Sequence, residues 1–237
     1  MKNSSPEYAR VNLGRICITA LSRHGGVSGG DYVSLNLGSH VGDTQSDVDA
    51  NWKIVKELVD SDGITYLHAD HGTTVNVAGE FGEAPTGDGL VCKTPKHAIA
   101  ALSADCVPVA LVDPVNNVIA VGHAGWKGVL AHLMTELAKS FVELGADISK
   151  STAVIGPSIC GDCYEVGADR VELFGNSASV RDSTHLDLAA GVREQLSDLG
   201  FEITQIPGCN FEDENLFSYR RSGSKPTGRG GLVAIIN

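Results

Sequence analysis

Two histidines and one cysteine stand out, and two of the three lie at the ends of short apolar runs, where a side chain can emerge from a rigid scaffold into a cleft. Cys106 directly precedes one such run, His123 directly follows another, and His71 comes just before a β-rich segment. A thiolate and two imidazoles can hold a zinc ion and leave its fourth tetrahedral position open for water or substrate. We therefore expect His71, Cys106 and His123 to form a catalytic zinc site, with His68 as the competing candidate for the third ligand.

A β-hairpin is expected to bring Cys106 and His123 together. The β-rich runs Val107–Val112 and Val118–Val121 flank the sequence Asp-Pro-Val-Asn-Asn, which is typical of a turn. Cys106 lies six residues before Val112, the last residue of the first run. His123 lies six residues after Asn117, the last residue of the turn. Both side chains then lie at the open end of the hairpin. Without a metal, the same pair would be a cysteine nucleophile and its base, so both interpretations stay open.

The segment Gly125–Gly128 follows His123 and leads directly into a helical pattern. Free backbone N–H groups at the start of a helix bind anions, and Lys127 adds a positive charge, so a phosphate would fit there. The glycines are equally consistent with a tight turn between strand and helix. Asp105 adjoins Cys106, and the alternation of an extended strand points its side chain away from the metal unless the chain bends.

A second cysteine pair, Cys160 and Cys163, has the C-x-x-C spacing of metal and redox motifs. The surroundings do not resemble a thioredoxin-type motif, so we expect no redox role. A zinc ion at this pair would need two further ligands, which the sequence alone does not identify.

The elements that must position these residues are three helices and a larger number of short strands. The first predicted helix begins at a cap, Thr44 or Ser46, and ends before Gly63. The second follows the apolar stripe Leu130–Leu144 and ends at Gly145, and the third covers Asp187–Leu199. The β-rich runs are Arg15–Thr19, Ala98–Leu102, Pro108–Val112, Val118–Val121, Thr152–Ile155 and Leu232–Ile236. A hairpin beside helices indicates an α+β or mixed α/β layered fold and argues against a purely parallel sheet. We expect one domain over residues 1–237.

Charge and composition favour a small-molecule enzyme of the cytoplasm. The formal charge of -11 repels phosphate backbones and anionic lipid, so neither a nucleic acid nor a membrane is an expected partner. The stretch Met1–Arg10 lacks the apolar core of a signal peptide, and no apolar run approaches the roughly 20 residues needed to cross a bilayer. Six dispersed cysteines are expected to be reduced thiols. The late basic cluster around Arg220 is either a solvated loop or an anion clamp.

A series of short motifs occurs in order along nearly the whole chain. They are Ser22–Ser28, Ser34–Gly38, His71–Gly72, Ala104–Pro108, Gly122–Gly128, Gly156–Ile159, Cys163–Gly167 and Phe217–Arg221. Together they resemble the YfiH family, also called the multicopper polyphenol oxidoreductase (laccase) or purine nucleoside phosphorylase family.

The resemblance implies an α+β (mixed α/β) fold, a layered sandwich of mixed β-sheets flanked by α-helices. It also implies a zinc ion bound by His71, Cys106 and His123. It also implies phosphorolysis of adenosine, inosine, guanosine or methylthioadenosine, with deamination of adenosine as a further activity. The partners would be a nucleoside and phosphate, and the protein a monomer or small homo-oligomer. The expected substrate and phosphate ligands are Arg23, Asn36, Lys127 and Arg220. Lys127 stands where the family typically has arginine, which keeps the charge but loses the two-pronged hydrogen bonding of a guanidinium.

Three other functions compete with this one. A metal-free cysteine hydrolase would use Cys106 and His123 on a cell-wall precursor, because a cell-wall editing role has been assigned within the family. A copper polyphenol oxidase would need several histidine-rich copper sites, and eight histidines without a His-x-His pair argue against it. A binding protein with a structural metal is disfavoured by the open coordination position.

Overall fold

A computed structural model describes residues 5–223 and 225–237, so residues 1–4 of the N-terminal stretch considered above lie outside it. Two mixed six-stranded sheets form the centre of the molecule. In spatial order, the first sheet contains β1 (Glu7–Leu13), β2 (Ile16–Leu21), β12 (Gly230–Ile236), β7 (His97–Ser103), β3 (Gly63–His68) and β5 (Gly82–Thr86). The second contains β11 (Glu202–Gln205), β10 (Thr152–Ile155), β8 (Val107–Asp113), β9 (Val118–Ala124), β6 (Gly89–Cys92) and β4 (Val75–Val77).

Six α-helices complete the described part of the chain. They are α1 (Gln45–Leu58), α2 (Trp126–Leu130), α3 (Leu133–Glu143), α4 (Ala168–Glu172), α5 (Leu188–Asp198) and α6 (Tyr219–Ser222). Among the residues described, none of these helices has both the length and the apolar character needed to span a membrane.

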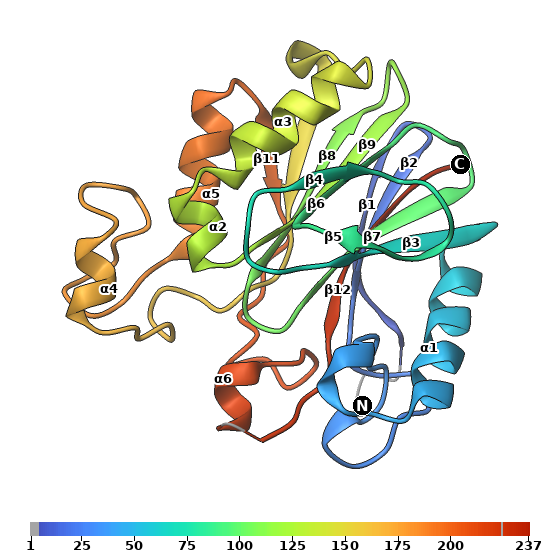
Figure 1. Cartoon of the computed structure of the whole chain (residues 1–237), viewed down its shortest axis with the longest axis horizontal. Coiled ribbons are helices and arrows are strands. Elements are labelled where there is room, and N and C mark those ends of the chain that lie inside the picture. Colours follow the sequence, from blue (N-terminus) through green and yellow to red (C-terminus); the bar gives the residue numbers. More distant parts are fainter. Residues whose placement is uncertain (1–4, 224) are drawn as a thin grey trace.

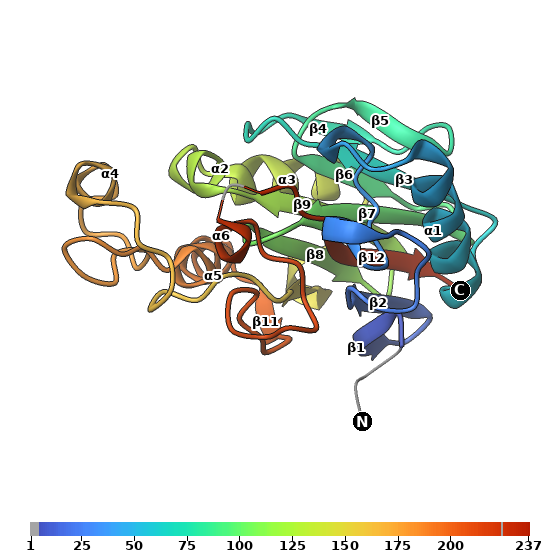
Figure 2. The ribbon, with the colours of Figure 1, turned by 90° about the horizontal axis from the view of Figure 1, so that it is seen from below.

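The molecule has four layers. Helix α1 covers the outer face of the first sheet, and α2, α3 and α5 cover the outer face of the second, on the opposite side of the molecule (Figure 1). A third apolar core lies between the two sheets. The loops around α4 project away from these layers in both views (Figures 1 and 2). This arrangement confirms the predicted layered sandwich of mixed sheets flanked by helices.

Strands β7, β8 and β9 lie at the centre of the molecule, and all of their residues are buried. In β8, Val109 and Leu111 pack toward the helices while Ala110 and Val112 pack toward the first sheet. A strand that is apolar on both faces can sit only between two covering layers. The continuous apolar runs of the sequence therefore mark the interior of the sandwich.

The predicted β8–β9 hairpin is confirmed, but its register differs by two residues. The structure pairs Asp113 with Val118 and Pro108 with His123, whereas the predicted count placed Cys106 opposite His123. The loop keeps four residues but starts one residue later than the count assumed, because Asp113 pairs with Val118 and its carboxylate accepts hydrogen bonds from Val115 N and Asn116 N, both at 2.9 Å. A shift of two residues keeps every side chain on its predicted face. Cys106 and His123 therefore still point to the same side.

The three predicted helices form with one difference. Thr44 is the N-cap residue of α1, and the Asp187 carboxylate caps α5 by accepting from Ala190 N. The middle stripe is interrupted at His132, which has a left-handed backbone (φ 57°), so it forms the two helices α2 and α3. The interruption redirects the chain between the site at the end of β9 and the long helix α3.

Candidate metal centre

The three expected metal ligands lie where the chain passes from one sheet to the other. His71 is in the connection from β3 in the first sheet to β4 in the second, and Cys106 ends the connection from β7 to β8. His123 is the penultimate residue of β9. Because β9 is antiparallel to β8, His123 lies at the same end of the sandwich as Cys106. Strand topology thus brings together residues that are far apart in the sequence.

The side chains of His71, Cys106 and His123 converge. One ligand atom from each lies within 4.8 Å of the others. The two imidazole rings meet edge to face, with centroids 5.0 Å apart and planes at 88°. A Cβ atom on Gly125 would come within 2.6 Å of His71 Cδ2, so this glycine allows the His71 ring to reach the cluster.

Asp88 holds two of these ligands in place. Its buried carboxylate accepts a 2.8 Å hydrogen bond from His123 Nδ1, which leaves Nε2 of that ring for a ligand. The same carboxylate accepts from the backbone N–H groups of His71 (3.1 Å) and Gly72 (2.7 Å). These bonds fix a turn in which His71 has a left-handed backbone (φ 66°). The orientation of both imidazoles therefore depends on one carboxylate.

The site favours an ionised thiolate. Burial by itself would raise the pKa of the Cys106 thiol, but the charge and hydrogen bond of His123, together with His71, lower that pKa to about 6. Burial likewise disfavours the charged form of His123, but the Cys106 thiolate and Asp88 raise its pKa to about 10. Cys106 is therefore poised either to ligate a metal or to act as a nucleophile.

The donor set fits a metal ion of intermediate or soft character. Sulfur and imidazole nitrogen are the usual ligands of zinc and are also accepted by copper. The carboxylate behind His123 is the outer partner that metal-bound histidines commonly have. His68 does not belong to the cluster, because its Nδ1 is paired with Glu83.

A cavity of about 660 Å³ opens above the cluster. Its lining includes all three ligands and Asp105. Asp105 has a backbone φ of 104°, and this bend turns its side chain into the same cavity as Cys106 instead of to the opposite face. Asp105 Oδ2 accepts from Arg220 N at 2.7 Å, while Oδ1 is buried without a hydrogen-bond partner among the described residues.

Three half-buried arginines also line the cavity: Arg170, Arg220 and Arg229. Arg220 lies over the ring of Tyr164 at 5.2 Å and donates to the Glu165 carbonyl at 2.7 Å. Arg170 lies 4.6 Å over the ring of Trp126. These contacts hold guanidinium groups in fixed positions on the cavity wall.

The structure brings Arg220 to the cavity but places the other expected anion ligands outside its lining. Arg23 donates to the Val33 carbonyl and lies over the Phe217 ring. Asn36 is fully buried, and its Oδ1 accepts from Gly38 N and Arg229 N. Lys127 is exposed on α2. Asn36 thus anchors the backbone of Arg229, which itself reaches the cavity.

The sequence alone did not identify Asp88, Tyr164 and Arg170 as site residues. Asp88 lies between two glycines at the start of β6, and a lone acidic residue there carries no motif. Tyr164 and Arg170 lie in and beyond a long connection after β10, whose path depends on tertiary contacts. A weak signal for Tyr164 was its place in the Cys163–Gly167 motif.

The fold and site define a class: a sandwich of two mixed sheets with a His-Cys-His cluster at one end, beneath an arginine-lined cavity. Residues 17–237 match the family model described as multi-copper polyphenol oxidoreductase laccase. The chain belongs to this family.

Several relatives are similar over nearly their full length. A purine nucleoside phosphorylase of Streptomyces coelicolor is 39% identical over 87% of this chain and 90% of its own. One from Mycobacterium bovis is 34% identical over 97% of both chains. Among solved structures, a Neisseria meningitidis protein of the DUF152 family superposes with a TM-score of 0.85 at 31% identity, covering 97% of this chain and 98% of its own. Bacillus licheniformis YfiH also gives 0.85, at 24% identity over 94% and 93% of the two chains.

Proposed function

We propose that this chain is a zinc-dependent purine nucleoside phosphorylase of the cytoplasm. The observation that carries the proposal is the convergence of His71, Cys106 and His123 beneath a cavity that also contains guanidinium groups. Relatives that carry the name purine nucleoside phosphorylase support it. Among the described residues, the one cluster that contains histidines has only two of them, which suits a zinc ion better than the several histidine-rich centres of a copper oxidase.

The cavity suits a neutral nucleoside and an anionic co-substrate. Its volume of about 660 Å³ is in the range of small-molecule sites. Tyr66, Tyr164 and Tyr219 supply aromatic surface for a purine ring. The guanidinium groups of Arg170, Arg220 and Arg229 supply the charge for phosphate in an otherwise acidic protein. The proposed substrates are adenosine, inosine, guanosine and methylthioadenosine.

The chain's own residues orient the reaction. The arginines hold phosphate so that one of its oxygens attacks the anomeric carbon of the ribose. The bond from that carbon to the purine nitrogen breaks, and its electron pair leaves with the base. Asp105 lines the cavity beside Cys106, and we propose that its carboxylate hydrogen-bonds the substrate. His71, Cys106 and His123 would hold the zinc ion, which would supply a Lewis acid when bound. Deamination of adenosine at the same site is the second activity that we propose.

A cysteine hydrolase acting on a cell-wall precursor is the second candidate function. The observation that favours it is the arrangement of Cys106, His123 and Asp88. The Asp88 carboxylate orients the His123 imidazole beside the Cys106 thiol, whose pKa is about 6. Such a nucleophile, base and orienting acid need no metal.

One experiment separates these functions. The metal content of the purified protein is measured, and the protein is then incubated with adenosine in the presence or absence of phosphate. Phosphorolysis yields adenine and ribose 1-phosphate only when phosphate is present, and deamination yields inosine in either case. Cys106→Ser is expected to abolish both, whereas Cys17→Ser, which changes a cysteine remote from the cavity, is the control.

A zinc-loaded, folded protein that produces neither adenine nor inosine would refute the proposal. Activity on a cell-wall peptide that persists after zinc is removed and is lost on alkylation of Cys106 would establish the hydrolase instead. Bound copper with oxidation of phenols would establish the laccase.

A further inference from the structure

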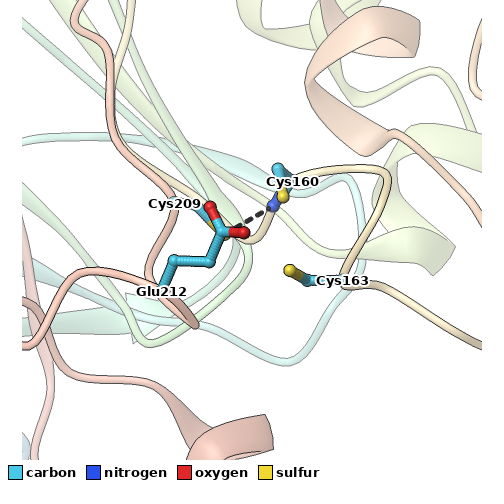
Figure 3. Close-up of side chains that lie close together, drawn as sticks. All are labelled: Cys160, Cys163, Cys209 and Glu212. Atoms are coloured by element: carbon cyan, nitrogen blue, oxygen red, sulfur yellow. Dashed lines mark hydrogen bonds between the residues drawn. The ribbon is translucent and has the colours of Figure 1, made fainter.

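A second group of metal-binding side chains lies outside the His-Cys-His cluster. Cys160, Cys163 and Cys209 and the carboxylate of Glu212 gather at one point, with one ligand atom of each within 4.8 Å of the others. Figure 3 shows the Cys160, Cys163 and Glu212 side chains turned toward the Cys209 position. The three cysteines are half-buried free thiols. The two further ligands that the sequence alone does not identify for the Cys160–Cys163 motif are Cys209 and Glu212.

Two loops that are distant in the sequence build this group. The first follows β10 and carries Cys160 and Cys163, and the second follows β11 and carries Cys209 and Glu212. Strands β10 and β11 are parallel neighbours, so their carboxyl ends deliver both loops to the same edge of the sheet. A short parallel bridge between Ser158 and Cys209 continues that pairing. The ligands are therefore held together by the sheet and not by chance proximity.

Backbone hydrogen bonds order the cysteines. Cys163 N donates to the Cys160 carbonyl at 3.1 Å, which closes the tight turn between the two cysteines. Cys160 N donates to Cys209 Sγ at 3.3 Å, drawn as the dashed line in Figure 3. A backbone N–H directed at sulfur stabilises negative charge on that sulfur.

We propose that Cys160, Cys163, Cys209 and Glu212 form a second, structural zinc site. Three sulfur ligands and one carboxylate oxygen complete a tetrahedral zinc shell, with no position left open for substrate. Binding releases the three thiol protons to solvent, and no oxidant or reductant is required. A disulfide would use only two of the three sulfurs and would leave the third sulfur and the carboxylate without a role.

The second zinc site supports the wall of the cavity. Cys163 directly precedes Tyr164, and Ile159 N in the same loop donates to the Asp105 carbonyl at 2.9 Å. The loop after β11 continues toward α6, which carries Arg220. Cross-linking the two loops therefore fixes Tyr164 and Arg220 relative to Asp105. This inference stands on the cluster itself and is independent of the proposed activity.

The test removes the first site and measures the zinc that is left. Cys106→Ala is purified with reductant, and its zinc is measured by mass spectrometry of the metal and by a colorimetric chelator. We expect about one zinc per chain in Cys106→Ala and essentially none in Cys106→Ala combined with Cys163→Ser. Loss of this zinc is expected to lower the melting temperature by roughly 5–10 °C. Cys106→Ala combined with Cys17→Ser is the matched control and should keep its zinc.

Two further measurements keep the test decisive if the cysteine variant does not fold. Glu212→Gln, an exposed substitution, is expected to release zinc to a chelator roughly 10–100-fold faster. Cobalt added to metal-free Cys106→Ala should give the thiolate-to-cobalt absorption of a tetrahedral sulfur-rich site. A folded Cys106→Ala protein without zinc or cobalt binding would overturn the proposal. So would thiol counting that finds two of the three cysteines joined in a disulfide under the same reducing conditions.

Discussion

At the scale of single residues, the site depends on a carboxylate that touches neither the cavity nor the proposed metal. Asp88 receives hydrogen bonds from the ring of His123 and from the backbone of His71 and Gly72. Burial alone would raise the pKa of Asp88, but the hydrogen bond and charge of His123, with hydrogen bonds from Asp70 and Gly72, hold it below its ordinary value, so the group stays ionised. Its charge and its four acceptor sites make it a positioning residue for both histidines.

Replacing Asp88 should weaken metal binding more than it weakens the fold. Asp88→Asn turns an amide N–H₂ toward N–H donors and removes the negative charge behind His123. We expect zinc affinity at the His71–Cys106–His123 cluster to fall roughly 10–100-fold, measured by competition with a chelator. Asp113→Asn is the matched control, because it also removes a buried carboxylate but at the opposite end of the β8–β9 hairpin. Equal affinities in the two variants would contradict the role given to Asp88.

Gly125 gives a steric test of the same cluster. Gly125→Ala places a methyl group within 2.6 Å of His71 Cδ2, and the backbone there (φ -76°) accepts alanine without strain. His71 must then move, so we expect weaker zinc binding and loss of activity with little change in melting temperature. Gly79→Ala, where a new Cβ meets nothing within 4 Å, should keep both properties. Unchanged zinc affinity in Gly125→Ala would mean that His71 is not a ligand.

At the scale of elements, the sequence predicted well where the apolar pattern was continuous and poorly where tertiary contacts decide. Strands β8, β9 and β10 are apolar runs, and their positions are confirmed within two or three residues. Strand β5, Gly-Glu-Ala-Pro-Thr, has no β-rich pattern and contains a proline, and it forms only because it lies at the sheet edge beside β3. The register of the β8–β9 hairpin differs from the predicted register because counting residues along the sequence does not reveal the hydrogen bonds that the Asp113 carboxylate accepts in the turn.

The Asp113 turn provides a prediction that depends on pH. Its buried carboxylate accepts from Val115 N, Asn116 N, the Asn116 amide and Asp147 N. Burial would raise the pKa of Asp113, but these hydrogen bonds lower it below its ordinary value of 3.8. Asp113→Asn is expected to reduce the free energy of unfolding by about 1–3 kcal/mol at pH 7, measured in urea.

The sign of the pH dependence follows from the direction of that shift. A depressed pKa contributes stability above the unfolded value, and the contribution disappears as pH falls through the folded pKa. The difference between wild type and Asp113→Asn should therefore be constant near neutrality and shrink below about pH 4, over the range where the wild type stays folded. A difference that is unchanged down to pH 3 would show that the charge of Asp113 contributes nothing.

At the scale of the whole molecule, the site is an end of the sandwich where chain crossings meet. His71, Cys106 and His123 could be chosen from the sequence because Cys106 and His123 adjoin apolar runs and His71 precedes a β-rich segment. Asp88 and Arg170 could not, because their positions depend on how β6 and the long connection after β10 fold back to that end. Metal ligands can be predicted from their residue types, whereas positioning residues can be recognised only from the fold.

Three arginines line the cavity of this acidic molecule: Arg170, Arg220 and Arg229. If the cavity binds phosphate, as the proposed function requires, Arg170→Gln should raise the KM for phosphate roughly 10–100-fold, because a hydrogen bond to a charged group contributes about 1.5–3 kcal/mol. The KM for the nucleoside should change little. Arg181→Gln removes an equally long side chain that is paired with Asp162 on the surface, and it should leave both constants unchanged. A rise in the KM for the nucleoside alone would place the purine, and not the phosphate, against Arg170.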